Sequence, residues 1–230
     1  EDKGADLART AQTDCEWSRT GALPVREPKP VSRPYLLTKR TLDVLLSLLG
    51  LVVASPLMAI TAVAVKLSSP GPVLFRQARV GRFGRPFMIL KFRSMRTGSN
   101  GPSVTAGLDP RITRVGRVLR RSKIDELPQL WNVLVGDMSL VGPRPEVKQY
   151  VNAYPGDYGR ILTIRPGITD FAALEYRDEE SVLAAYADPE AAYIDVVLPA
   201  KIALYHRYVD EMSVGTDLAL LLRTLVRLIR

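Results

Sequence analysis

Two adjacent carboxylates, Asp125 and Glu126, are the residues best suited to chemistry on a phosphate. They lie in the stretch SKIDELPQL, directly after an arginine-rich segment and just ahead of Pro128. Because proline is well tolerated only in the first turn of a helix, the pattern predicts a helix that begins near Ile124. The helix dipole favours negative charge in that turn, so we expect both carboxylates to be ionised at neutral pH.

Adjacent positions on a helix point about 100° apart, so the two carboxylates would have different tasks. One could attack phosphorus and form an acyl phosphate, while the other holds a magnesium ion. A carboxylate and a phosphate repel each other, so this chemistry also needs cations to neutralise the phosphate. The alternative for an isolated Asp-Glu pair is an ordinary charge pair at the start of a helix.

Arginines that could supply this positive charge occur in two places. Arg144 lies between two prolines, and the restricted backbone would fix the direction of a side chain whose fork can grip a phosphate twice. The segment DPRITRVGRVLRRS predicts a helix with one apolar face and a second face that carries Arg114, Arg117 and Arg121. These three could hold phosphates or lipid headgroups. A plain surface turn and a solvated basic face are the alternatives.

Composition narrows the function further. The net charge of +8 and the isoelectric point of about 9.7 favour anionic partners. The basic segments carry no nucleic-acid-binding motif, so we expect no nucleic-acid partner. A single histidine, His206, and a single cysteine, Cys15, argue against a Ser-His-Asp or Cys-His mechanism and against a zinc site. Any metal would be a hard cation held by oxygen atoms, which favours magnesium.

A hydrophobic segment, residues 42–65, is long enough to cross a hydrocarbon core of about 30 Å as one helix. Ser55 and Pro56 stand near its middle and predict a bend there, with the Ser55 hydroxyl bonding to a freed carbonyl. Positive residues flank both ends, as expected for two ends on the cytoplasmic side. We therefore expect a re-entrant helix-break-helix hairpin, with a simple transmembrane helix as the alternative. Lys39 or Arg40 is expected to pair with Asp43 at the membrane interface.

The chain divides into four parts. Residues 1–34 are polar and predict a disordered tail, residues 35–69 form the membrane hairpin, and residues 70–215 form a globular catalytic domain. Residues 216–230 predict an amphipathic helix that lies in the membrane interface or packs on the globular core. Two short apolar runs around GRFGR predict a β-hairpin. The expected fold is mixed α/β of the α+β kind, mostly helical, with a small sheet.

The order of these motifs resembles the bacterial sugar transferase family, the monotopic polyprenyl-phosphate phosphoglycosyl transferases. The resemblance covers about residues 39–230. Besides the membrane segment broken at Ser-Pro, these stretches carry it: KR-T-L-D, SSPGPVLFRQARVGRFGRPFMILKFRSM, DPRITRVGRVLRRS, KIDELPQLWNVLVGDMSLVGPRPE, RPGITDFAALEYRDEE and VVLPAKIALYHRYVDE. The family starts the synthesis of lipid-linked glycans, such as exopolysaccharide or O-antigen.

The resemblance implies a magnesium-dependent transfer of sugar phosphate from a UDP-sugar to a polyprenyl phosphate such as undecaprenyl phosphate, with release of UMP. It implies that Asp125 is the nucleophile of a covalent phosphosugar intermediate, that Glu126 is the magnesium ligand and that Arg144 binds phosphate or nucleotide. It also implies a monotopic anchor, bent at Ser55 and Pro56, in the bacterial inner membrane, with the active site on the cytoplasmic face among membrane lipids.

The sequence leaves two other functions open. The first is a non-enzymatic, membrane-anchored scaffold that binds acidic lipids. The second is a hydrolase that cleaves the diphosphate with water. The sugar, the glycan pathway and the formation of a homodimer are also left open.

Overall fold

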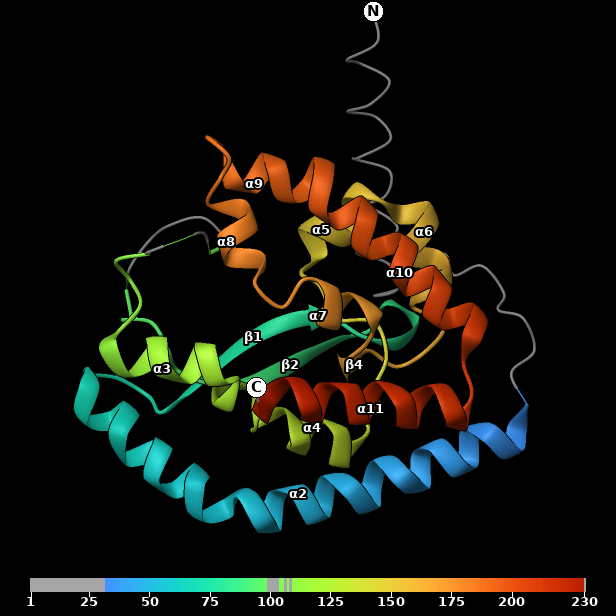
Figure 1. The fold of residues 1–230 in the computed structure, drawn as a ribbon, viewed down its shortest axis with the longest axis horizontal. Coiled ribbons are helices and arrows are strands. Elements are labelled where there is room, and N and C mark those ends of the chain that lie inside the picture. Colours follow the sequence, from blue (N-terminus) through green and yellow to red (C-terminus); the bar gives the residue numbers. More distant parts are fainter. Residues whose placement is uncertain (1–31, 99–103, 106, 108, 230) are drawn as a thin grey trace, which may run out of the picture.

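The computed structural model describes residues 32–98, 104–105, 107 and 109–229, and it shows a mostly helical protein with two small sheets (Figure 1). This confirms the expected fold class. Most of the predicted tail, residues 1–31 with Cys15, lies outside the described residues. So do parts of the loop that joins the β-hairpin to the arginine-rich helix.

The hydrophobic segment forms one continuous helix, α2 (Arg33–Ser68), which bows under the rest of the molecule (Figure 1). It is long and apolar enough to cross a membrane, and little of its most apolar part is buried. Large apolar side chains with exposed fractions of 57% to 82% line it: Leu45, Leu49, Val52, Val53, Ile60, Val63 and Leu67. An exposed apolar surface of this length indicates contact with lipid.

The predicted break at Ser55 and Pro56 is a bend within this helix and not an interruption. Proline has no N–H for the carbonyl of Val52 one turn earlier, and its ring pushes against that turn, so the helix curves. The Ser55 hydroxyl donates to the Val52 carbonyl at 2.7 Å, as predicted. A carbonyl left unpaired in an apolar setting costs about 1–3 kcal/mol, so this bond helps the helix to continue past the proline.

Both ends of α2 are fastened to the same globular domain. At the N-terminal end, Lys39 Nζ lies 2.9 Å from the Asp217 carboxylate, and Arg40 donates to the carbonyls of Val133 and Leu134. At the other end, the buried Arg93 donates to carbonyls that close α2: Val65, Ser69 and Pro70. The two ends therefore meet one body of protein.

Asp43 does not form the predicted ion pair with Lys39 or Arg40. Its carboxylate is buried and accepts a hydrogen bond from the backbone N–H of Leu140 at 2.9 Å. Lys39 is drawn instead to Asp217, which is remote in sequence. The prediction was wrong because it considered only partners on the same helix.

The β-hairpin appears where it was predicted. β1 (Leu74–Val80) and β2 (Pro86–Phe92) pair antiparallel, so that Phe75 lies opposite Lys91. A 3₁₀ turn, η1 (Arg82–Gly84), joins the strands, and Phe83 takes the left-handed conformation there with φ of 58°. The backbone N–H of Phe83 donates to the Leu162 carbonyl at 2.7 Å, which holds the turn against the domain.

A second, parallel sheet joins β3 (Ser139–Val141) to β4 (Gly167–Thr169). Gly142, directly after β3, comes so close to Gly167, the first residue of β4, that a Cβ atom at Gly167 would lie 2.1 Å from the Gly142 nitrogen. Only glycine permits this approach. The proline-flanked loop of Arg144 leaves β3 at this crossing.

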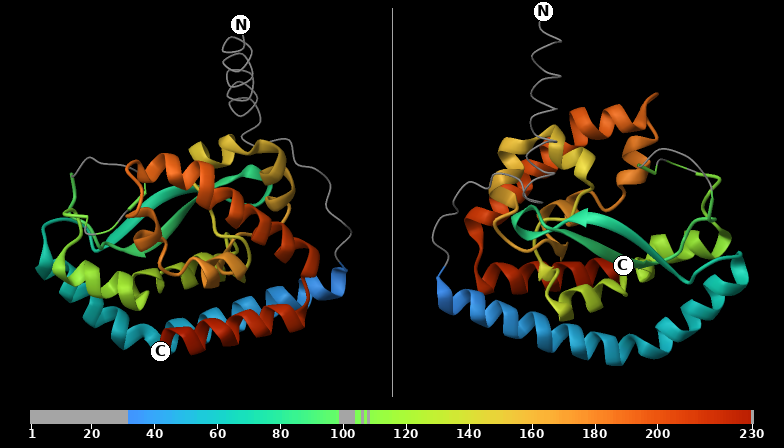
Figure 2. Two further views of the ribbon diagram at one scale, coloured as in Figure 1. Left: turned by 45° about the horizontal axis from the view of Figure 1, so that its top comes forward. Right: turned by 180° about the vertical axis from the view of Figure 1, so that it is seen from behind.

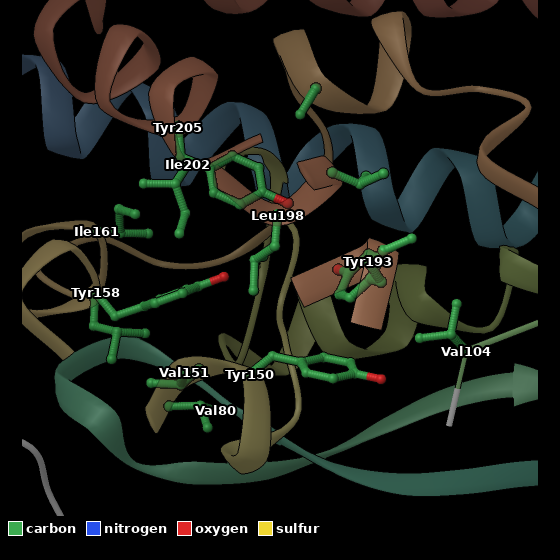
Figure 3. Close-up of a cluster of buried hydrophobic side chains, with 14 of the residues drawn as sticks. Val80, Val104, Tyr150, Val151, Tyr158, Ile161, Tyr193, Leu198, Ile202 and Tyr205 are labelled. Atoms are coloured by element: carbon green, nitrogen blue, oxygen red, sulfur yellow. The ribbon is translucent and has the colours of Figure 1, made fainter. Parts of the chain in front are cut away.

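Helices complete the domain around these sheets (Figures 1 and 2). Tyr158, Leu198 and Tyr205 pack in the larger core cluster (Figure 3), most of whose residues come from the helices that follow β3 in the sequence. The helices are α3 (Arg114–Ser122), η2 (Ile124–Glu126), α4 (Gln129–Val135), α5 (Lys148–Ala153), α6 (Pro155–Ile161), α7 (Phe171–Glu175), α8 (Glu179–Leu183), α9 (Pro189–Ala192), η3 (Tyr193–Val197), α10 (Leu198–Glu211) and α11 (Val214–Ile229).

The last helix, α11, combines the two alternatives left by the sequence. Leu220 is buried in the core, whereas Leu218, Leu222, Leu225 and Val226 are exposed. The helix therefore packs on the domain through one face and presents apolar side chains on another. The side chains of Leu228 and Ile229 and all of Arg230 lie outside the described residues.

Candidate active site

A large cavity opens beside the β-hairpin, with a volume of about 1930 Å³. The hairpin, α3, η2, the proline-flanked loop, α7, α10 and α11 all contribute to its wall. The structure brings Asp125, Glu126 and Arg144 together on this wall and adds Lys91 from β2. A cavity of this size exceeds the upper end of the range usual for small-molecule sites, so it has room for a large ligand or for two.

The two carboxylates are presented by a short 3₁₀ turn. Lys123 adopts the left-handed conformation, with φ of 57°, and ends α3. η2 (Ile124–Glu126) follows, and α4 begins only at Gln129, after Pro128. The expected helix start near Ile124 is thus a 3₁₀ turn that leads into the helix, and it places both side chains in the cavity wall.

Glu126 is held by two cations. Its carboxylate lies 3.0 Å from Lys91 Nζ and accepts from Arg144 at 2.5 and 3.3 Å. Burial acts to raise the pKa of Glu126, but the charges of Arg144 and Lys91 outweigh it and hold the pKa well below its usual range. Glu126 is therefore a firmly ionised carboxylate.

Asp125 has a different environment from its neighbour. It is only 7% exposed, and its Oδ1 has no hydrogen-bond partner although it lines the cavity. Burial, followed by the negative charge of Glu126, raises its pKa above the ordinary value. The helix dipole invoked from the sequence is therefore not the dominant influence here. An under-solvated carboxylate without partners is a stronger nucleophile than a hydrated one.

The loop that carries Arg144 is fixed through its backbone. Arg144 N donates to Asp170 Oδ2 at 3.2 Å, and Gly167 N donates to the Pro143 carbonyl at 2.8 Å. Asp170 is fully buried and also accepts from Ala173 N, where it caps α7. These contacts fix the loop, and the Arg144 guanidinium pairs with Glu126, a partner that the sequence did not indicate.

We predict a pH-dependent contribution of Asp170 to stability. Burial raises the pKa of Asp170 to about 6, so the folded protein holds this proton more tightly than the unfolded chain. The stability from this group is present at low pH and is lost as the pH rises through about 6. Relative to Asp170→Asn, the free energy of unfolding of the wild type should fall by on the order of 3 kcal/mol between pH 4 and pH 7. Denaturant unfolding in detergent would measure this difference in the free energy of unfolding. Free energies of unfolding that change in parallel with pH in the wild type and Asp170→Asn would contradict the prediction.

The structure separates the three arginines predicted on α3. Arg117 and Arg121 line the cavity, whereas Arg114 is exposed and does not. Arg120, which was not singled out, also lines the cavity and pairs with Glu180 of α8 through Nε at 2.9 Å. Two of the three arginines therefore line the cavity, and their binding of phosphate stays a prediction.

Lys91 was missed by the sequence reasoning, although the sequence contains a signal for it. Alternation along β2 puts Phe87, Ile89 and Lys91 on the same face, and Ile89 is buried in the core. A lysine on a core-facing row needs an acidic partner, because burying an unpaired charge is costly. Its partner here is Glu126.

A second missed group supports the far part of the cavity wall. Glu146, just after the proline-flanked loop, accepts from the hydroxyl of Tyr193 at 2.7 Å and lies 3.4 Å from Lys201 Nζ. Lys201 also donates to Glu179 at 2.9 Å. Burial acts to raise the pKa of Glu146, but Lys201 and Arg79 outweigh it and lower the pKa. No local pattern in the sequence indicates these partners.

The fold and the site define a membrane-associated protein whose cavity, lined by carboxylates and basic side chains, suits phosphate chemistry. The chain belongs to the bacterial sugar transferase family, whose model matches residues 34–230. It is 41% identical over 217 residues to the UDP-glucose:undecaprenyl-phosphate glucose-1-phosphate transferase of Caulobacter vibrioides, covering 91% of this chain and 77% of that protein.

Other relatives are longer than the matched region. The transferase of the same name from Escherichia coli is 39% identical over 205 residues, which is 86% of this chain and 41% of that protein. The UDP-N-acetylgalactosamine-undecaprenyl-phosphate N-acetylgalactosaminephosphotransferase of Aeromonas hydrophila is 47% identical over 150 residues, 63% of this chain and 35% of that protein. The chain thus spans less than half the length of these two relatives.

Proposed function

We propose that this protein transfers a sugar phosphate from a UDP-sugar to undecaprenyl phosphate or a similar polyprenyl phosphate. This transfer would be the first step in the synthesis of exopolysaccharide or another glycan. The observation that carries the proposal is the unpartnered Asp125 carboxylate beside Glu126, Lys91 and Arg144 in one large cavity. The names of the relatives support the substrates. A non-enzymatic scaffold does not account for this arrangement.

Two displacements at phosphorus would complete the reaction. In the first, an oxygen of Asp125 bonds to the phosphorus next to the sugar, and the bond from that phosphorus to the bridging oxygen breaks, so that UMP leaves with the bridging oxygen. In the second, a phosphate oxygen of the lipid attacks the same phosphorus and the Asp125 carboxylate is restored. No net proton is required, and Lys91 and Arg144 are placed to offset the negative charge.

The donor atoms present fit a magnesium ion. Glu126 is ionised, and Asp125 offers an oxygen without a partner. Among the described residues, no group of three or more acidic, histidine or cysteine side chains could hold a metal alone. Magnesium commonly combines one or two carboxylates with substrate phosphate oxygens, so Glu126 and the diphosphate would hold it together. When bound, it would supply positive charge to the phosphate oxygens.

Glu126→Gln tests the assignment of this metal ligand. The amide cannot replace the charge that attracts a divalent cation, so we expect activity to fall about tenfold or more and the magnesium titration to shift to higher concentration. Activity at graded magnesium concentrations would measure both effects. Glu211→Gln, on an exposed part of α10, is the matched control. A titration midpoint equal to that of the wild type would remove Glu126 from the metal site.

For the membrane arrangement, we propose a monotopic anchor at the cytoplasmic face of the bacterial inner membrane. Two observations support it: both ends of α2 contact one domain, and the exposed apolar surface lies along α2 and α11. A helix whose ends meet the same body cannot readily place them on opposite sides of a bilayer. A shallow anchor would hold the cavity at the level of lipid phosphates.

Pro56→Ala tests this arrangement. Alanine restores the missing N–H and removes the ring, so α2 should straighten and pull away from one of its two attachments. With the native Cys15 replaced by serine and Pro56 kept, single cysteines placed at Ser32 or Ser68 should react with a membrane-impermeant reagent from the same side of sealed vesicles. In Pro56→Ala, we expect one of the two to lose part of its labelling. Opposite-side labelling in the wild type would contradict the monotopic anchor.

The reaction itself is tested by the release of UMP in a membrane assay. Sustained release should require a UDP-sugar, a polyprenyl phosphate and magnesium together, and a panel of UDP-sugars would identify the donor. Sustained release of UMP without lipid phosphate would indicate a hydrolase. No release with any donor in the panel would favour the scaffold.

A further inference from the structure

A second basic site lies away from the catalytic cavity, where the β-hairpin turn approaches the N-terminal half of α2. The views agree that this turn and the beginning of α2 lie on the same side of the molecule (Figures 1 and 2). A small cavity of about 30 Å³ opens there, between Arg82 of the turn, Arg165 and the first turns of α2. Lys39 and Arg40 also line it.

The two arginines are held by their inner nitrogens. Arg82 Nε donates to the Thr163 carbonyl at 2.9 Å, and Arg165 Nε donates to the Gly136 carbonyl at 2.9 Å. Within the described part of the chain, the terminal nitrogens of both guanidinium groups have no hydrogen-bond partner and neither group forms an ion pair. Both guanidinium groups are therefore held through Nε, and that of Arg82 also lies over the Phe83 ring at 4.4 Å. The terminal nitrogens of both groups stay available to a ligand.

The positive charges of Arg82 and Arg165 are not balanced by acidic side chains in this small cavity. Burial, and then the nearby charge of Arg165, lowers the pKa of Arg82 from its ordinary value. Lys39 is already paired with Asp217, and Arg40 is committed to helix carbonyls. Among the residues that the structure describes, Asp43 is the one acidic side chain lining this cavity, and its carboxylate accepts a hydrogen bond from the Leu140 backbone N–H. Two like charges placed together in this way favour a bound anion.

The location indicates the source of that anion. The volume suits one oxygen-sized group, so the body of any ligand must remain outside. The adjacent part of α2 exposes Leu37 and Leu45, with exposed fractions of 70% and 57%, as expected for a helix in contact with hydrocarbon. The phosphate groups of lipids lie at the boundary between hydrocarbon and water, and the planar fork of an arginine matches their geometry.

We propose that Arg82 and Arg165 form a binding site for the phosphate of an anionic membrane lipid, separate from the catalytic cavity. One phosphate oxygen enters the small cavity and the two guanidinium groups grip the others. The bound lipid would fasten the hairpin turn to the membrane interface next to α2. This site does not depend on the proposed reaction, because none of its residues lies in the catalytic cavity.

Lipid retention in native mass spectrometry tests the site. The protein would be released from bilayers that contain phosphatidylglycerol and phosphatidylcholine. The wild type should retain one phosphatidylglycerol in preference to phosphatidylcholine. The double variant Arg82→Gln/Arg165→Gln should retain at least about tenfold less phosphatidylglycerol, because the charged hydrogen bonds to the phosphate are lost. The charge-matched control Arg85→Gln/Arg207→Gln should behave as the wild type.

Two further measurements keep the test decisive. Arg82→Lys retains the charge without the fork and should show intermediate retention, so a folding defect in the glutamine variant cannot imitate the result. Inorganic phosphate, at the same concentration as the lipid, should not displace it. Equal retention by the wild type and the double variant would overturn the proposal, as would full displacement by inorganic phosphate.

Discussion

Asp125→Asn is expected to lose turnover by on the order of 10⁴-fold or more, because the amide cannot form the acyl phosphate. Binding of the UDP-sugar should change little, since Lys91 and Arg144 keep their partner Glu126. The steady-state rate of UMP release, together with the dissociation constant of the UDP-sugar, would separate the two effects.

The same substitution should not destabilise the fold. The raised pKa of Asp125 shows that its charged form is disfavoured where it lies, so a neutral side chain of nearly the same size should unfold no more readily. Asp157→Asn, at the partner of His206 on the outer side of the domain, is the control and should retain activity. Residual turnover of the Asp125→Asn protein near the wild-type rate would mean that another group attacks phosphorus.

Arg144→Gln is expected to reduce turnover by about 10²- to 10³-fold, the range found when one charge-stabilising donor is removed from an active site. It also leaves Glu126 with Lys91 as its remaining ion-pair partner. The turnover number should fall by a larger factor than the Michaelis constant rises. The reason is that the charge on the transferred phosphoryl group is greatest in the transition state. Steady-state kinetics with saturating lipid phosphate would separate the two.

Arg144→Lys distinguishes geometry from charge. Lysine keeps the positive charge but has no planar fork, so it should recover only part of the lost activity. Arg160→Gln, whose partner is the exposed Asp210, is the matched control on α6. Full recovery with lysine would show that the direction of the side chain, fixed by the two prolines and Asp170, has no catalytic value.

Local patterns in the sequence predicted much of the fold. The hairpin around GRFGR, the arginine-rich helix and the bond from Ser55 to Val52 depend on residues within a few positions of one another. The length and hydropathy of α2 were equally plain. The sequence did not show whether Pro56 would break the helix or only bend it. That outcome depends on how both ends of α2 are held by a domain that follows it in the sequence.

The site was predicted only in part, for the same physical reason. Asp125, Glu126 and Arg144 stood out by their immediate neighbours, but Lys91 reaches Glu126 from 35 positions away. The partners of Lys39 and Arg93 also come from distant segments. The raised pKa of Asp125 results from burial, which a helix-dipole argument cannot supply. Long-range packing therefore decided which charges became paired and which carboxylate was left free.

The most direct measurement is a single-turnover experiment with a UDP-sugar labelled in the sugar, in the absence of lipid phosphate. We expect rapid release of UMP, at most one per protein molecule, with the label recovered on the peptide that contains Asp125 and lost when polyprenyl phosphate is added. UMP release only after lipid is added, or label recovered on a different residue, would contradict it.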